Sequence, residues 1–179
     1  MTHTTTASLW LYNHNLLGQA TGLIERLKTE ALPSFNYSQA IGPHIRHIIE
    51  HYTALLVALG SASALVDYDA RDRDMRIQSV PDATLAKLWE LQTTMRRFAD
   101  TVGLHANLKH PLVTRLQAGN VGEFTVEVAT TLGRELMFLS SHTVHHFALI
   151  GHYSKAAGVE MGHDFGKAPA TLAFELKAA

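Results

Sequence analysis

The segment Leu132–Ala157 contains the sequence Ser141-His-Thr-Val-His-His146 within a long apolar pattern that has the period of a helix. His142 and His146 are four residues apart, so on a helix their side chains lie one above the other on the same face. Two neutral imidazoles held in this way can bind one metal ion from a rigid backbone. We therefore expect this helix to carry the chemistry of the chain.

A second group of histidines marks another expected helix. His44, His47 and His51 repeat at i, i+3 and i+7, which places them on one helical stripe. The helix is expected from about Pro43 to Leu59, because proline is well tolerated at the first helical position. His47 is the best metal candidate, since isoleucines flank it near mid-helix. His44 lies in the first turn and is expected either to be an end-of-helix polar residue or to support the site from behind a ligand. His51 is expected to support His47 or to line the pocket.

The rest of the chain predicts an all-α fold. Two further helices are expected over Ala7–Glu30 and from Asp82 to Val102, each with apolar residues at a helical period. A dense mixed-charge stretch, Asp67–Asp74, reads as a loop. Leu112–Gln117 and Phe124–Val128 read as short strands around a glycine turn. These elements predict a four-helix bundle with a small β-hairpin in the crossover before the last helix.

Length and composition limit the class of protein. The chain has 179 residues, which predicts a single domain over 1–179. Its formal net charge is −1, so we expect neither nucleic acid nor a membrane as a partner. It has no cysteine, which excludes disulfides, thiolate nucleophiles and cysteine-type zinc sites. The first residues lack the basic start and apolar core of a signal peptide, and no apolar run is long enough to cross a bilayer. We expect a cytoplasmic protein.

The histidine groups favour one mononuclear metal site over other catalytic schemes. A zincin requires His-Glu-x-x-His and a di-iron bundle requires Glu-x-x-His on two helices, and the chain has neither arrangement. Dinucleotide, Walker A and nucleophile-elbow motifs are also missing. The expected ligands are His47, His142 and His146, which leave a fourth position open to water or substrate. Zinc or nickel suits imidazole ligands. His145 can replace His146 as the partner of His142. Alternatively, the histidines form a polar network without an ion.

These residues resemble the DinB-like superfamily, which includes bacillithiol transferases and mycothiol-dependent maleylpyruvate isomerases. That family has one metal-binding histidine on its second helix and a His-x-x-x-His pair on its last bundle helix. The matching positions here are His47, within Ile41–His51, and His142 with His146. The resemblance covers most of the chain. It is strongest to an uncharacterised branch that has a Gly-Arg-Glu-Leu segment before the last histidines, seen here at 133–136.

The resemblance implies a reaction at the metal. Characterised members use the metal to lower the pKa of a thiol, so that the thiolate attacks an electrophile. Applied to this chain, the cosubstrate would be a low-molecular-weight thiol and the reaction S-transfer, although a metal-bound hydroxide for hydrolysis needs the same ligands. A non-catalytic, metal-stabilised binding or stress-response protein is the alternative, with the shell closed by His51 or His145. A homodimer is expected.

Two further side chains are candidates for supporting roles. Glu135 lies seven residues before His142, on the same helix face. It is expected to orient a ligand, to act as a base, or to form a salt bridge with Arg134 or another basic residue. Arg46, together with Arg71 and Arg73, is a candidate for holding an anionic substrate carboxylate. In the competing interpretation, the charges of the mixed-charge stretch pair with one another in a solvated loop.

Overall fold

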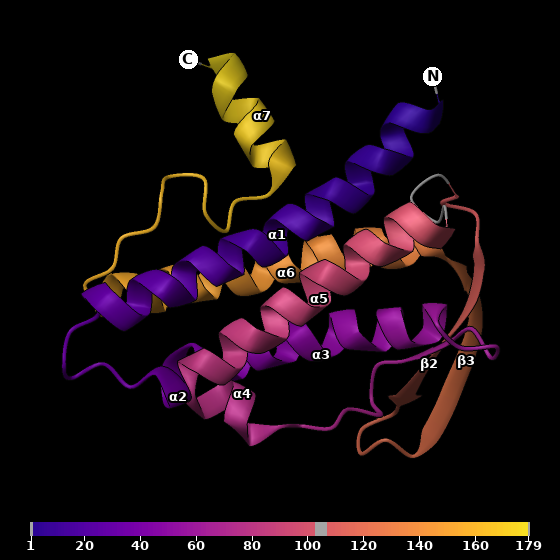
Figure 1. Cartoon of the computed structure of the whole chain (residues 1–179), viewed down its shortest axis with the longest axis horizontal. Helices are drawn as coiled ribbons and strands as arrows, with labels where there is room; N and C mark the ends of the chain where they lie inside the picture. Colours follow the sequence, from indigo (N-terminus) through magenta and orange to yellow (C-terminus); the bar gives the residue numbers. More distant parts are fainter. Residues whose placement is uncertain (1, 103–106, 179) are drawn as a thin grey trace.

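A computed structural model describes residues 2–102 and 107–178 of the chain (Figure 1). Four long helices pack against one another in this structure: α1 (Thr2–Glu30), α3 (Gly42–Leu59), α5 (Pro81–Val102) and α6 (Leu132–Ala156). Their bounds lie close to those expected from the apolar period. The periodic pattern predicts these helices well because each one buries an apolar stripe against its neighbours.

The structure also has three shorter helices, which the sequence analysis did not predict. They are α2 (Tyr37–Ala40), α4 (Met75–Ser79) and α7 (Pro169–Ala178). The mixed-charge stretch therefore leads directly into a helix, because the Asp74 side chain caps α4 by accepting from the Arg76 backbone N–H at 2.8 Å. Such short helices contain too few turns to display an apolar period.

A three-stranded sheet lies at one end of the helices. Its strands are β1 (Leu65–Asp67), β2 (Pro111–Ala118) and β3 (Phe124–Thr131), in the order β1-β2-β3. β2 and β3 pair antiparallel as a hairpin, while β1 pairs parallel with β2, in a register that joins Val66 to Thr114. The sheet is therefore mixed.

The expectation of an all-α four-helix bundle is wrong. The described residues form seven helices and a three-stranded mixed sheet, which is a mixed α/β fold that is mostly helical. The missed strand, β1, has three residues and finds its partner far along the chain. A strand of that length shows no alternation in the sequence, so only the packed chain reveals it.

The interior is formed by apolar side chains of the four long helices and of β1. Its largest fully buried members include Leu16, Leu17 and Ile24 of α1, Ile45, Ile48 and Tyr52 of α3, Leu88 of α5 and Phe147 of α6. The start of α3 sits so close to α4 that a Cβ atom on Gly42 would collide with the backbone carbonyl of Gln78. Glycine is required there by space, and this close approach fixes where α3 begins.

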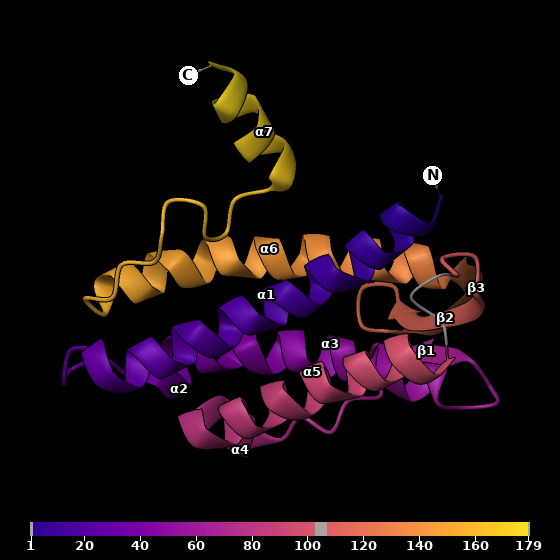
Figure 2. The same ribbon diagram turned by 45° about the horizontal axis from the view of Figure 1, so that its top comes forward.

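The C-terminal helix lies apart from this interior. α7 projects away from the long helices in both ribbon views (Figures 1 and 2), and none of its residues is buried. Among the described helices, none is both long enough and apolar enough to cross a membrane.

Candidate metal centre

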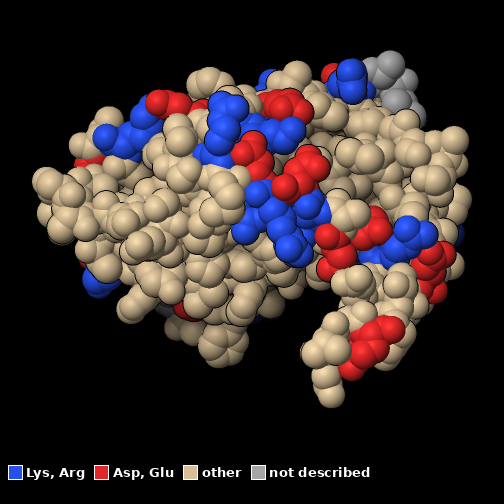
Figure 3. Space-filling view, turned by 90° about the horizontal axis from the view of Figure 1, so that it is seen from below, with Lys and Arg blue, Asp and Glu red and all other residues tan. Residues whose placement is uncertain are grey.

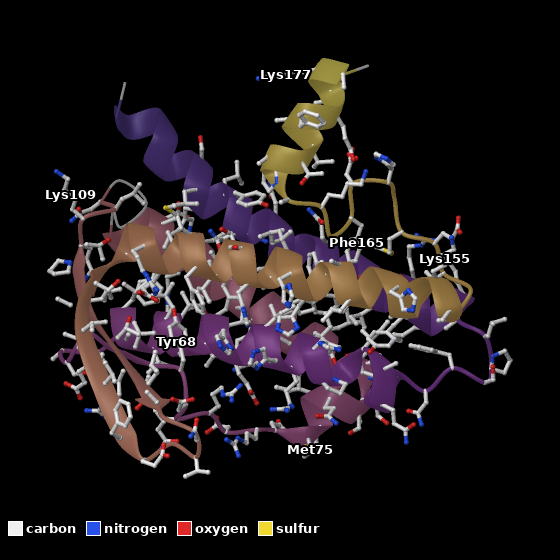
Figure 4. All side chains as sticks on the ribbon, turned by 180° about the vertical axis from the view of Figure 1, so that it is seen from behind. Tyr68, Met75, Lys109, Lys155, Phe165 and Lys177 are labelled. Atoms are coloured by element: carbon white, nitrogen blue, oxygen red, sulfur yellow. The ribbon has the colours of Figure 1, made fainter. Side chains whose placement is uncertain are left out.

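Helices α3 and α6 run side by side (Figure 4) and bring three histidines together. One imidazole nitrogen from each of His47, His142 and His146 lies within 4.8 Å of the other two. The ring centroids are 5.0 Å apart for His47 and His142, 4.9 Å for His47 and His146, and 4.6 Å for His142 and His146. The two helices thus place the three expected ligands in a single cluster.

The local sequence explains this placement. On α3, Ile45, Ile48 and Ile49 are buried in the core, so His47 is held at the edge of the apolar face. On α6, Val144 and Phe147 are buried in the same way and hold the adjoining face, which carries the histidine pair, toward α3. Because the helix repeats every 3.6 residues, residues four apart stay on one face.

The three imidazoles are neutral at physiological pH. Burial, together with the neighbouring imidazoles and Arg71, lowers the pKa of His47 to about 3. Burial and the imidazoles around it lower the pKa of His146 to about 4. Burial is also the main cause that lowers the pKa of His142. A neutral imidazole is the protonation state that binds a divalent cation, so each ring can offer a lone pair.

One atom of the cluster has no hydrogen-bond partner. The Nε2 atom of His142 is buried and makes no hydrogen bond to the described residues. Leaving a buried polar atom without a partner costs about 1–3 kcal/mol. A metal ion would give this nitrogen a partner, and three neutral imidazoles are a donor set that suits zinc and nickel. The residues present therefore fit a metal ion.

His44 is placed behind His146. The Nδ1 atoms of the two rings are 3.0 Å apart, so one of them donates a hydrogen bond to the other. If Nδ1 of His146 is the donor, its Nε2 is free to face the cluster, which is the usual arrangement behind a metal-binding histidine. The structure thus places His44, in the first turn of α3, in hydrogen-bond contact with His146.

His51 lies on the other side of His47. Its Nδ1–H donates to the backbone carbonyl of His47 at 2.8 Å, and its ring stacks on Tyr68 with centroids 5.1 Å apart. Burial lowers the pKa of His51 to about 4, although the bond to the carbonyl opposes this. Its ring centroid is 4.2 Å from that of His47 and 4.7 Å from that of His142, so it borders the cluster directly.

His145 points away from the cluster. It is exposed and helps to line a shallow hollow between α6 and the segment that leads to α7. Its ring centroid is 5.8 Å from that of His146. The i, i+4 pair therefore reaches α3, while His145 faces outward, because a shift of one residue turns a helical side chain by about 100°.

Among the described residues, no hydrogen bond joins Glu135 to a histidine. Its buried carboxylate accepts hydrogen bonds from Tyr68 Oη at 2.6 Å, Thr130 Oγ1 at 2.6 Å, Arg134 Nη1 at 2.9 Å and Thr114 Oγ1 at 3.0 Å. Burial alone would raise the pKa of Glu135, but these hydrogen bonds outweigh it and hold the pKa below its usual value. The pairing with Arg134 is thus present within α6, while Thr114 and Thr130 tie the sheet to this helix.

Arg46 is bound to side chains of α3 and α4. It donates from Nη1 to Glu50 Oε1 at 2.6 Å and from Nε to Gln78 Oε1 at 3.1 Å. Arg71, from the loop after β1, reaches the cluster instead. Its Nη1 donates to His47 Nδ1 at 2.7 Å and lies 3.4 Å from Glu50 Oε2. Of the arginines considered for an anionic substrate, Arg71 is therefore the one in contact with an expected metal ligand.

A cleft of about 620 Å³ lies on the far side of Arg71 and Glu50, between α3, α4, α5 and the mixed-charge stretch. Both signs of charge line it, including Asp72, Arg76 and Lys87, together with apolar side chains of α3 and α5. Figure 3 shows basic and acidic side chains interleaved on the face seen from below, without a large area of one sign. This face gives no sign of an electrostatic attraction to a polyanion.

Two residues of the site were not found by sequence reasoning. Glu50 lies three residues after His47 on α3, so the helical period would have placed it beside the histidine stripe. Tyr68 offers no such signal. It enters the site from the loop after β1 (Figure 4). It links the two polar clusters because its hydroxyl binds Glu135 while its ring stacks on His51.

Comparison with known proteins does not identify a family. Neither a family model nor a solved structure matches the chain. The chain is similar to a protein of Rhizopus delemar described as FK506-binding protein 5, with 27% identity over 108 residues. The match covers 60% of this chain but only 27% of that protein's length. The resemblance to the DinB-like superfamily stays a prediction.

Proposed function

We propose that this chain is a metal-dependent enzyme related to the DinB-like superfamily, with zinc or nickel held by His47, His142 and His146. The observation that carries the proposal is a cluster of three imidazoles from two helices, in which the buried His142 Nε2 has no partner among the described residues. Three ligands leave a coordination position for substrate, as in catalytic rather than structural zinc sites.

The proposed reaction is S-transfer from a low-molecular-weight thiol. When bound, the metal would lower the pKa of the thiol and so supply a thiolate at neutral pH. The chain has no cysteine, so the sulfur must come from a cosubstrate. His44 would orient His146, and the half-buried setting of the cluster would limit the access of water. A cytoplasmic location and a homodimer remain predictions that accompany this proposal.

A second function is favoured by the position of His51. Because its ring borders both His47 and His142, it can act as a fourth ligand and close the shell. A closed four-ligand site is typical of structural metals. The protein would then be a non-catalytic, metal-stabilised binding or stress-response protein.

Both functions require a bound metal ion, so the metal content of the protein tests them together. Mass spectrometry of untagged protein should find about one zinc or nickel per chain in the wild type, as a mononuclear site requires. His47→Ala and His146→Ala should lose the ion. His152→Ala is the matched control, because it removes an exposed histidine from the same helix and should keep the metal. A wild type that stays free of metal after incubation with zinc and nickel would reject both functions.

Cobalt substitution separates the two functions. If the shell has an open position, adding a small thiol such as 2-mercaptoethanol to the cobalt protein should produce a thiolate-to-cobalt charge-transfer band. His51→Ala should then retain the metal and the band. If His51 closes the shell, the band should be missing from the wild type and should appear only in His51→Ala.

A further inference from the structure

The contact between Arg71 and His47 determines which nitrogen of His47 carries the proton. Arg71 Nη1 donates to His47 Nδ1 at 2.7 Å. A guanidinium has donors only and stays charged at every relevant pH, so Nδ1 must be the acceptor. A neutral imidazole has one acceptor and one donor nitrogen. His47 therefore carries its proton on Nε2.

This tautomer is incompatible with metal binding by His47. Its Nε2 carries a proton and has no lone pair for a metal, while the lone pair of Nδ1 already points at Arg71. Whichever nitrogen serves as ligand, the bond to Arg71 has to break first. His146 is different, because its Nδ1 faces His44, a ring that can accept as well as donate. His47 on α3 must therefore break a hydrogen bond before it can bind a metal, whereas His146 on α6 need not.

We propose that Arg71 is a positioning residue that competes with the metal for His47, and that Glu50 takes its place when the metal binds. This inference rests on the proposed metal site. Once Arg71 withdraws, the Nδ1–H of His47 needs an acceptor, as metal-binding histidines almost always have. Glu50 is the group we assign, since it lies three residues along the same helix and already shares Arg71 Nη1 with His47.

The surroundings give Arg71 room to move. Its side chain also lines the 620 Å³ cleft, so it can turn away from His47 without entering the core. Its Nε is buried and has no hydrogen-bond partner among the described residues, so the present position does not satisfy the whole guanidinium. Arg46 holds the other oxygen of Glu50, at 2.6 Å, and fixes that carboxylate in place. The site thus contains both Arg71, the donor that competes with the metal, and Glu50, the acceptor for the Nδ1–H of metal-bound His47.

Imidazole nitrogen shifts test the tautomer directly. We would record ¹⁵N NMR spectra of chelator-treated protein, with His47→Ala to assign the ring. In the wild type, Nδ1 of His47 should have the shift of an unprotonated acceptor and Nε2 that of a protonated nitrogen. When zinc is added, the proton of His47 should move from Nε2 to Nδ1. A proton on Nδ1 of His47 before zinc is added would overturn the inference, whatever the metal affinity.

Zinc affinity tests the competition. Measured by chelator competition, Arg71→Gln should bind zinc about tenfold more tightly than the wild type, because no charge-assisted hydrogen bond has to be broken. Glu50→Gln should bind about tenfold more weakly, because His47 then lacks its carboxylate acceptor. Arg73→Gln is the matched control. It removes the same charge from an exposed position two residues away and should change the affinity less than about threefold.

The outcomes distinguish this inference from the proposed function. If the wild type binds zinc and Arg71→Gln binds it no more tightly, the role of Arg71 is rejected while the metal site stands. If Arg73→Gln gains as much affinity as Arg71→Gln, the effect is one of net charge and the inference fails. If neither the wild type nor any of the variants binds zinc, both the proposed function and the inference are rejected.

Discussion

Helix α6 carries two polar clusters, one buried and one half-buried, that differ in how completely their atoms are satisfied. At its first turn, Glu135 receives four hydrogen bonds from side chains of the sheet, the loop after β1 and the helix itself. Two turns later, His142 leaves Nε2 buried without a partner among the described residues. A saturated cluster stabilises a fold, whereas an unsaturated one has capacity left for a ligand. The carboxylate belongs to the scaffold and the imidazoles to the site.

Tyr68 connects the two clusters. Its hydroxyl donates to Glu135 and its ring stacks on His51. The loop after β1 also supplies Arg71 to His47, so one segment of chain reaches both clusters. The experiments below test whether the clusters have separate roles.

Removing the carboxylate of the saturated cluster should have the largest effect. Glu135→Ala should lower the free energy of unfolding by about 3 kcal/mol, because it leaves several buried donors without their acceptor. Urea denaturation measures this loss. Glu127→Ala is the control, since its carboxylate is exposed and paired with Arg115, and it should cost less than about 1 kcal/mol. Equal losses in the two variants would remove the distinction between a buried hub and a surface pair.

The unsaturated cluster should respond to metal instead. Zinc at about 100 times its dissociation constant should raise the free energy of unfolding of the wild type by about 2.7 kcal/mol. His142→Ala should lose this gain, yet in the presence of chelator it should unfold within about 1 kcal/mol of the wild type. The comparison uses urea denaturation with and without zinc. A large loss for His142→Ala in chelator would show that the histidines are part of the scaffold.

The residue that links the clusters should separate their roles. Tyr68→Phe removes the hydroxyl bound to Glu135 but keeps the ring against His51, so it should cost about 1.5 kcal/mol. Its zinc content should match that of the wild type. If the variant loses zinc as well as stability, the two clusters act as one unit.

Acid should lower the free energy of unfolding through the histidine cluster, by less for each histidine than the substitutions above. Burial and neighbouring imidazoles lower the pKa of His146 to about 4, below its value of about 6.5 in an unfolded chain. Between pH 7 and pH 5, His146 is therefore protonated in the unfolded chain but stays neutral in the folded chain, so the free energy of unfolding falls. After allowing for solvent screening of this half-buried ring, His146 should account for about 1 kcal/mol of that fall.

His146→Ala, studied in chelator, should accordingly lose less stability between pH 7 and pH 5 than the wild type does. His152→Ala, which lacks an exposed histidine of the same helix, should follow the wild type. A wild-type stability that stays constant over this range would contradict the neutral, buried state of the cluster.

Much of the fold was predictable where the signal is local. The apolar period of α6 predicted a helix from Leu132 to about Ala157, and the structure has it from Leu132 to Ala156. The antiparallel strands 111–118 and 124–131 also follow from alternation around a turn. The fold class was nevertheless wrong, because β1 and the short helices have no periodic pattern of their own.

The site divides in the same way. The spacing of His142 and His146 fixes their common face by itself, because four residues on a helix return nearly to the same direction. By contrast, Tyr68 reaches Glu135 across 67 positions of sequence, and Arg71 reaches His47 across 24. No sequence period relates residues so far apart, since their meeting depends on the path of the loop after β1.

Helical spacing alone indicates which faces of α3 and α6 carry imidazoles, because helical geometry is local and converts spacing into direction. Tertiary packing is needed to bring these faces together, to surround Glu135 with side chains of the sheet and of the loop after β1, and to place Arg71 against His47. Those outcomes depend on how the helices and the sheet pack, and packing is a property of the whole chain rather than of any one segment.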